Sequence, residues 1–138
     1  MKTQVKLFIL IPIILISCNS GTPLRQKSPE EIRQELKIKE QTSFLNYLTV
    51  EYNLDKTFWT SEDVIKGFVA NSASIARFKD VVLTVTFLTA TDTELGSKDY
   101  VVYKFFEPNS RTDFEIKTKS PAATKKIGVK VKTVVPVD

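Results

Sequence analysis

The residue with the most distinctive chemistry in this chain is Cys18, the only cysteine among 138 residues. A single thiol can act as a nucleophile, bind a metal or carry a modification. The sequence contains no histidine, which removes the Cys-His and Ser-His nucleophile pairs and most zinc sites. It also offers no second cysteine for a disulfide, so the stability of the domain must come from apolar burial.

The residues before Cys18 have the form of a secretory signal. Lys2 and Lys6 precede an apolar run over residues 7–16, and the small residue Ser17 stands directly before Cys18. As a helix this run would extend for about 15 Å, which is too short for a bilayer core of about 30 Å. A basic start, a short apolar segment and a small final residue are typical of a cleaved signal peptide over residues 1–17.

Leu15-Ile16-Ser17-Cys18 resembles the lipobox of bacterial lipoproteins. In that family the cysteine thiol is acylated by diacylglycerol, the chain is cut before it, and the new amino group is usually acylated too. The resemblance implies cleavage between Ser17 and Cys18 and a covalent lipid on Cys18. Acyl chains contribute about 0.8 kcal/mol per buried methylene, so several of them would anchor the protein to a membrane. The alternative is an ordinary secretory signal that happens to end in Ser-Cys.

Asn19 follows Cys18 in place of an acidic residue, which is consistent with export onward to the outer membrane of a Gram-negative bacterium. We therefore expect a protein held in the cell envelope by its lipid, with the membrane as its first partner. Removal of residues 1–17 leaves 121 residues, enough for one domain. It also leaves 18 basic against 16 acidic residues, so charge gives little support to a nucleic-acid partner and we expect none.

Carboxylates are the other groups that could do chemistry. Glu62-Asp63 and the pair Asp92 and Glu94 fall in expected loops, where they could serve acid/base catalysis or bind calcium. A glycosidase needs two carboxylates facing each other across a cleft, and calcium takes about six to eight oxygen ligands. The glycines are too scattered to form a phosphate-binding loop. We expect solvated turn residues, with no catalytic residue, no metal site and no cofactor apart from the lipid on Cys18.

Aromatic residues supply the candidate binding contacts. They gather in a polar segment at Phe58-Trp59 and in an expected strand over residues 98–106. Alternation in that strand places Tyr100, Val102 and Phe106 on one face, and Val101, Tyr103 and Phe105 on the other. One set must enter the core, and the other could form a face for a glycan or a protein partner. The candidate ligand contacts are therefore Phe58, Trp59, Tyr103 and Phe105.

Two arrangements of the outer aromatic set remain open. The set packs under an N-terminal helix or against the Phe58-Trp59 loop, which is the arrangement we favour, or it stays exposed. Coplanar exposed rings at Trp59 or Tyr103 would favour a carbohydrate-binding module, whereas covered rings would favour a plain scaffold.

The elements that must position these residues begin after a polar stretch, residues 18–27, which we expect to be a flexible tether. Ser28-Pro29-Glu30-Glu31 predicts the start of a helix over residues 28–43, with Ser28 as N-cap and Glu31 completing a capping box. Its apolar face, at Ile32 and Leu36, is thin, so we interpret the helix as a stalk or flap. A coiled-coil dimer is the alternative, but the helix has too few heptads for one.

From residue 44 to the end the apolar residues alternate, as in half-buried strands. Turn signals separate strands predicted at residues 48–54, 64–71, 78–88, 98–106, 113–117 and 126–135. Six or seven such strands in one domain predict an all-β fold, an antiparallel β-sandwich over residues 44–138.

Five stretches of this domain, in this order, carry a resemblance to a known family: Gly67-Phe68-Val69-Ala70-Asn71, residues 78–87, Leu95-Gly96, Pro108-Asn109-Ser110 and Asp113-Phe114-Glu115-Ile116. Together they resemble FxLYD-type domains, immunoglobulin-like β-sandwiches of bacterial exported lipoproteins such as small lipoproteins of Bacteroidota. The resemblance covers residues 64–135, although residues 85–89 lack the Tyr-Asp ending of the namesake motif. It implies an immunoglobulin-like fold and an envelope location, and it brings no catalytic residues.

A local excess of lysine marks the C-terminal part, at Lys117, Lys119, Lys125, Lys126, Lys130 and Lys132. It could steer the domain to anionic headgroups or an acidic partner, although we favour a solvated face. Our main hypothesis is a lipid-anchored, non-enzymatic envelope protein that works as an interaction or accessory module. The alternatives are a carbohydrate-binding module, with an envelope glycan in place of a protein partner, and an enzyme that uses carboxylates alone.

Overall fold

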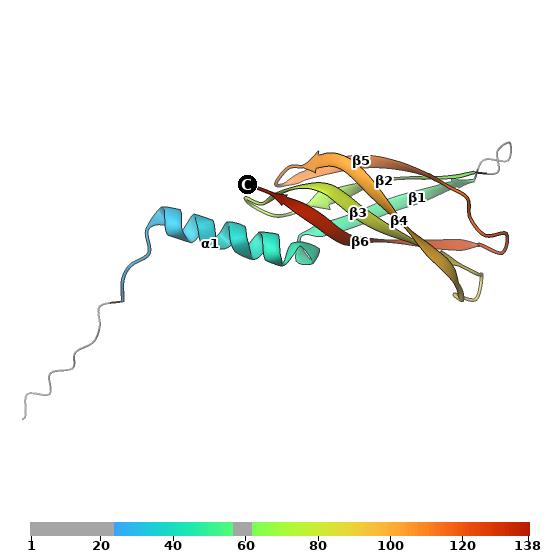
Figure 1. Cartoon of the computed structure of the whole chain (residues 1–138), viewed down its shortest axis with the longest axis horizontal. Coiled ribbons are helices and arrows are strands. Elements are labelled where there is room, and N and C mark those ends of the chain that lie inside the picture. Colours follow the sequence, from blue (N-terminus) through green and yellow to red (C-terminus); the bar gives the residue numbers. More distant parts are fainter. Residues whose placement is uncertain (1–23, 57–61) are drawn as a thin grey trace, which may run out of the picture.

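The computed structural model describes residues 24–56 and 62–138. The predictions for Ser17, Cys18, Phe58 and Trp59 fall outside the described residues and stay predictions. Within the described part, one α-helix and a short 3-10 turn precede six strands (Figure 1). Their bounds are α1 (Pro29–Thr42), η1 (Phe44–Asn46), β1 (Leu48–Lys56), β2 (Asp63–Asn71), β3 (Arg77–Leu88), β4 (Glu94–Phe106), β5 (Ser110–Thr118) and β6 (Lys126–Val137).

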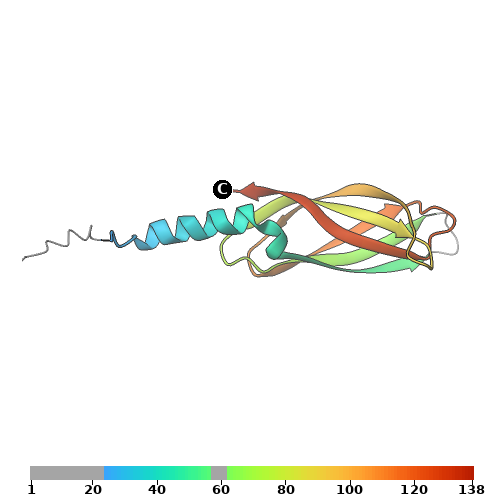
Figure 2. The ribbon, with the colours of Figure 1, turned by 90° about the horizontal axis from the view of Figure 1, so that it is seen from below.

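The six strands form two antiparallel sheets, with strand orders β1-β2-β5 and β4-β3-β6. The sheets pack face to face as the two layers of a sandwich (Figures 1 and 2), which confirms the predicted all-β fold of two antiparallel layers. β4 begins at Glu94, earlier than the predicted residue 98, because Leu88 at the end of the long β3 strand pairs with Glu94.

The core lies between the two sheets and follows the alternation of the strands. In β3 every second residue from Val81 to Phe87 is buried, as the sequence pattern predicts. Three phenylalanines, at 78, 87 and 106, are completely or almost completely buried and are the largest such side chains between the layers. The other buried apolar side chains come from both sheets and from the β2–β3 turn: Leu48, Ile65, Val69, Ala73, Ala76, Val81, Leu83, Val85, Val102, Phe114, Ile116, Val129 and Val134.

The helix α1 starts as its sequence predicts. Ser28 is the N-cap, its side chain accepts from the Glu31 backbone N–H, and the Glu31 carboxylate accepts from the Ser28 backbone N–H. The helix projects from one end of the sandwich (Figures 1 and 2). Ile32 on its thin apolar face is exposed, so α1 is a stalk and does not lie along a sheet.

The stalk is held to the sandwich through Glu40 in its last turn. The Glu40 side chain is almost completely buried, and its carboxylate accepts hydrogen bonds of 2.8, 2.9 and 2.8 Å from the backbone N–H groups of residues 74, 75 and 76. Burial raises the pKa of Glu40, but these hydrogen bonds outweigh it and leave the pKa below its ordinary value. An ionised carboxylate therefore fixes the stalk to the β2–β3 turn.

The same turn is braced from within by Asn71. The Asn71 side-chain amide donates to the carbonyl oxygens of Ala76 and Phe106, at 3.0 and 3.1 Å, and its oxygen accepts from the Ala73 N–H at 3.0 Å. These bonds join the end of β2 to the end of β4. The turn that receives Glu40 is consequently well ordered by its own hydrogen bonds.

Candidate functional site: an exposed aromatic face

Strand β4 displays aromatic side chains on the outside of the sandwich. Val102 and Phe106 point into the core and are buried, while Val101, Tyr103 and Phe105 point outward. The exposed fractions are 78% for Tyr103 and 52% for Phe105. The two faces of this strand are therefore divided as the alternation predicts.

The prediction that the outer set packs under the N-terminal helix is wrong, and the other favoured arrangement, against the Phe58-Trp59 loop, involves residues outside the described ones. Tyr103 is too exposed to be covered by any neighbour. The reason is the direction of α1, which Glu40 fixes to the β2–β3 turn so that the helix runs away from the sheets (Figure 2). The stalk leaves the outer surface of the β4-β3-β6 sheet uncovered at these rings.

Valines of the neighbouring strands extend the exposed surface. The pairing register places Val135 and Phe105 on either side of Lys79, and Val82 directly beside Val101. Val135 is also exposed, and Val82 is half-buried. We define the aromatic face as Val82, Val101, Tyr103, Phe105 and Val135, a set that crosses all three strands of one sheet.

Charged groups border the aromatic face. The Arg77 guanidinium lies 4.0 Å from the centre of the Phe105 ring and is held by Glu107, with Nε 2.7 Å from Oε1. At the other end, Asp99 accepts from Lys132 and Thr84. The hydrogen bond from Lys132, and then that from Thr84, lowers the pKa of Asp99. Lys79 adds a charge between Phe105 and Val135, so the apolar centre of the face is formed by Val82, Val101 and Tyr103. An apolar centre with charged neighbours is the usual composition of a protein-binding surface.

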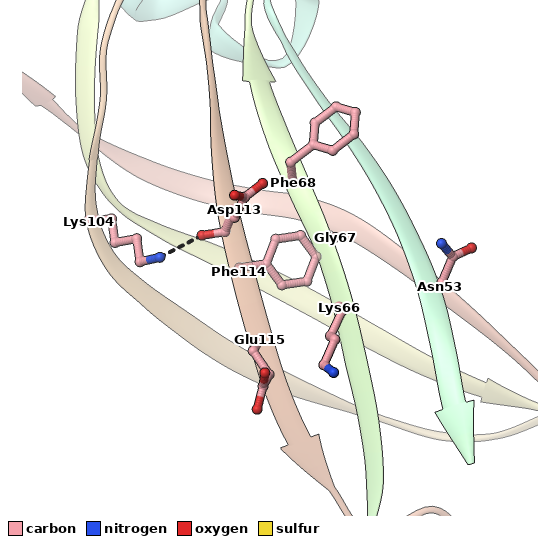
Figure 3. Close-up of a pocket in the computed structure, with 8 residues that line it drawn as sticks. All are labelled: Asn53, Lys66, Gly67, Phe68, Lys104, Asp113, Phe114 and Glu115. Atoms are coloured by element: carbon pink, nitrogen blue, oxygen red, sulfur yellow. Dashed lines mark hydrogen bonds between the residues drawn. The ribbon is translucent and has the colours of Figure 1, made fainter. Parts of the chain in front are cut away.

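The outer side of the β1-β2-β5 sheet carries a shallow hollow of about 460 Å³ (Figure 3). Lys104 reaches it from β4 and donates to the Asp113 carbonyl oxygen at 2.7 Å. The carboxylates of Asp113 and Glu115 point toward opposite ends of the hollow (Figure 3), so they do not face each other as glycosidase carboxylates must. The remaining lining residues are Asn53, Lys66, Gly67, Phe68 and Phe114.

The carboxylates considered for calcium are not gathered into a site. Asp92 is in a turn and pairs with Lys126, with Oδ1 2.8 Å from Nζ. In the described ranges, 24–56 and 62–138, no three metal-ligating side chains come together. No helix in these ranges has the length and apolar character that crossing a membrane requires.

A scan against models of protein families finds no match, and searches of curated proteins and of solved structures find none either. The case for a function therefore rests on the geometry of the residues.

Sequence reasoning missed the parts of this site that come from other strands. Val82, Val135 and Arg77 join Phe105 and Val101 only through the pairing register. The signal available for Val135 was its place beside Val134, because two adjacent valines in an alternating strand cannot both enter the core. Glu40 carried no local signal, since its partners lie 34 to 36 residues away.

Proposed function

We propose that this chain is a lipid-anchored protein of the bacterial envelope whose β-sandwich binds a protein partner through the aromatic face, without catalysing a reaction. The observation that carries the proposal is the exposure of Tyr103, at 78%, beside Phe105 and Val101 on the outer surface of one sheet. Exposed apolar surface of this kind costs solubility and commonly marks an interaction site. Tyrosine is enriched in such sites because its ring gives a large contact area and its hydroxyl a hydrogen bond.

The immunoglobulin-like family suggested by the sequence remains part of this proposal. The orders β1-β2-β5 and β4-β3-β6 correspond to strands A-B-E and C′-C-F of an immunoglobulin-like sandwich, with no counterpart of strand G among the described residues. This correspondence supports an FxLYD-type domain, because both sheets have the expected partners in the expected order.

The proposal can be tested by site-specific photo-cross-linking in intact cells of the source bacterium. A photoreactive phenylalanine analogue replaces Tyr103, and in a matched control it replaces Lys66, which is exposed on the outside of the other sheet. We expect a discrete protein adduct from position 103 and none from position 66. A second substitution, Val101→Glu, should remove the adduct by placing a charge in the apolar centre. Equal adducts from both positions, or none from 103, would refute the aromatic face as a protein-binding site.

Carbohydrate binding is the second candidate, and the exposed Tyr103 ring is the observation that favours it. Aromatic rings exposed on the surface of a sheet can stack on sugar rings through their apolar faces. Titration of the full chain with envelope polysaccharides distinguishes the two proposals. Binding that disappears in Tyr103→Ala would favour the glycan, whereas no polysaccharide binding together with a protein adduct at 103 would favour the protein partner.

A further inference from the structure

The two long sides of the sandwich, where the edges of the sheets meet, differ in the side-chain hydrogen bonds that cross them. On one side β4 lies beside β5, and on the other β1 lies beside β6. Neither pair of neighbours forms a hydrogen-bonded ladder, since each of the four is an edge strand of its own sheet. The unpaired edges of these strands are therefore available for other contacts.

Side-chain hydrogen bonds cross the β4–β5 side near both ends of a hollow of about 320 Å³, which lies between residues 100–104 of β4 and 114–117 of β5. The Tyr100 hydroxyl donates to Thr118 Oγ1 at 2.6 Å, and Lys98 Nζ donates to the Lys119 carbonyl oxygen at 3.2 Å. Further along, Lys104 bonds to the Asp113 carbonyl oxygen and Thr112 to that of Phe105. A chain that added to this edge would have to displace several of these bonds.

Among residues 24–56 and 62–138, the side-chain hydrogen bonds at the β1–β6 side lie near its two ends. The Tyr52 hydroxyl donates to the Ile127 carbonyl oxygen at 3.1 Å, and Gln41 Nε2 from α1 donates to the Val137 carbonyl oxygen at 3.4 Å. Between these points runs an open groove of about 440 Å³. Apolar side chains form most of its lining: Leu45, Leu48, Thr49, Val50, Val129, Lys130 and Val131.

The charge of β6 indicates which extended chain could occupy this groove. From Lys126 to Val137 the strand has three lysines and no acidic residue. Lys126 pairs with Asp92 and Lys132 with Asp99, while Lys130 is exposed at the border of the groove. Pairing with a second copy of β6 would oppose lysine to lysine, which is destabilising across strands. An extended acidic segment would place carboxylates near Lys130 and would pair with the free backbone groups of the β6 edge.

We propose that β6 is a docking edge for an extended segment of a partner protein in which apolar residues alternate with acidic ones. The segment adds as a further strand beside β6 and forms main-chain hydrogen bonds with it. Its apolar side chains enter the groove against Leu48 and Val131, and an acidic side chain lies near Lys130. This position beside β6 corresponds to strand G of the immunoglobulin-like sandwich proposed above.

The test uses the full chain, purified from membranes in mild detergent, and synthetic peptides of about eight residues, long enough to span about 26 Å of a strand edge. One peptide alternates valine and glutamate, a second alternates valine and lysine, and a third is the glutamate peptide with alternate amides N-methylated. We expect the glutamate peptide to protect β6 amides from hydrogen exchange. The lysine peptide should bind roughly tenfold more weakly, and the N-methylated peptide should not bind, because its donors are lost.

Variants of the protein test the same contacts from the other side. Lys130→Glu should lower the affinity for the glutamate peptide and raise the affinity for the lysine peptide. Leu45→Glu, at a largely exposed residue of the groove, should also lower the affinity for the glutamate peptide. Lys117→Glu, the same charge change on exposed β5, is the matched control and should change neither affinity. Tyr103→Ala should also leave peptide binding unchanged, which separates this inference from the proposed function.

Three outcomes would overturn the docking edge. They are equal affinity for the glutamate and lysine peptides, undiminished binding of the N-methylated peptide, and protection that appears on β4 in place of β6. Equal affinities would show that the edge has no preference for acidic side chains. Binding of the N-methylated peptide would show that main-chain hydrogen bonds are not needed, and protection on β4 would place the site elsewhere.

Discussion

Glu40 is the residue on which the position of the helix depends. Its carboxylate is buried at the junction of α1 with the β2–β3 turn and accepts three backbone hydrogen bonds. A buried anion is stable only when such donors surround it. This ionised side chain, together with the hydrogen bond from Gln41 to the Val137 carbonyl oxygen, therefore fixes the direction of the stalk.

We predict that Glu40→Gln lowers the free energy of unfolding by roughly 2 kcal/mol, because a neutral amide accepts fewer and weaker hydrogen bonds. Because the folded pKa of Glu40 lies below its ordinary value of 4.5, the stabilisation by the ionised group is complete well above pH 4.5. It is lost as the pH falls through 4.5 toward the lower folded value. Urea unfolding followed by circular dichroism should show a flatter acid dependence in Glu40→Gln than in the wild type. Glu35→Gln, on the exposed side of the helix, is the control and should change the free energy of unfolding by less than about 0.5 kcal/mol. An identical acid dependence in wild type and Glu40→Gln would contradict this role.

Gly67 shows a second constraint at the residue scale. It pairs with Tyr52 of β1, and a Cβ built on it would lie 2.1 Å from the Glu51 carbonyl oxygen. The close approach of these backbones requires glycine.

We predict that Gly67→Ala lowers the free energy of unfolding by roughly 2–3 kcal/mol, because the strands must separate to accept the methyl group. Gly128→Ala is the control, since a Cβ there meets only Thr86 Cβ, at 3.9 Å. Thermal unfolding of the two variants measures the difference. A Gly67→Ala protein as stable as Gly128→Ala would show that the spacing between β1 and β2 can accept a methyl group.

At the scale of the element, the two faces of β4 have different roles, one in the core and one on the surface. Its inward residues build the core, and its outward residues form the centre of the aromatic face. The two sets alternate along one strand, so packing and surface chemistry can vary independently. A change to an outward ring should consequently alter binding and leave folding intact.

We predict that Tyr103→Ala changes the free energy of unfolding by less than about 0.5 kcal/mol, because an exposed side chain has few contacts to lose. Phe106→Ala, three residues along the same strand and fully buried, should cost roughly 3–5 kcal/mol through the cavity it leaves. Chemical denaturation of both variants makes the comparison. A large loss of stability in Tyr103→Ala would mean that the ring belongs to the fold.

The whole molecule has the form of a sandwich carried on a helical stalk (Figure 1). With 14 residues, α1 is about 21 Å long at 1.5 Å per residue. It lies between the proposed anchor at Cys18 and the sandwich, so both proposed binding surfaces would be held away from the bilayer. The proposed function depends on that anchor.

We predict that Cys18→Ala abolishes acylation and moves the protein from the membrane fraction to the soluble fraction, because the thiol that would carry the lipid is gone. Fractionation of cells after labelling with a radioactive fatty acid measures both effects. Ser20→Ala, two residues later, is the control and should stay membrane-bound and labelled. Retention of the Cys18→Ala protein in membranes with unaltered acylation would disprove the lipoprotein assignment.

The features that the sequence determined by itself are local. Pro29 and the capping box set the start of α1, and the alternation of β3 set which of its residues are buried, because helix caps and strand faces depend on neighbours within a few residues. The long-range features came only from the tertiary structure. Glu40 accepts its hydrogen bonds from the β2–β3 turn, and the helix that it holds leaves Tyr103 exposed. The side-chain hydrogen bonds across each side of the sandwich depend on which edge strands lie side by side. These outcomes need contacts between distant segments, whose register and direction no local pattern encodes.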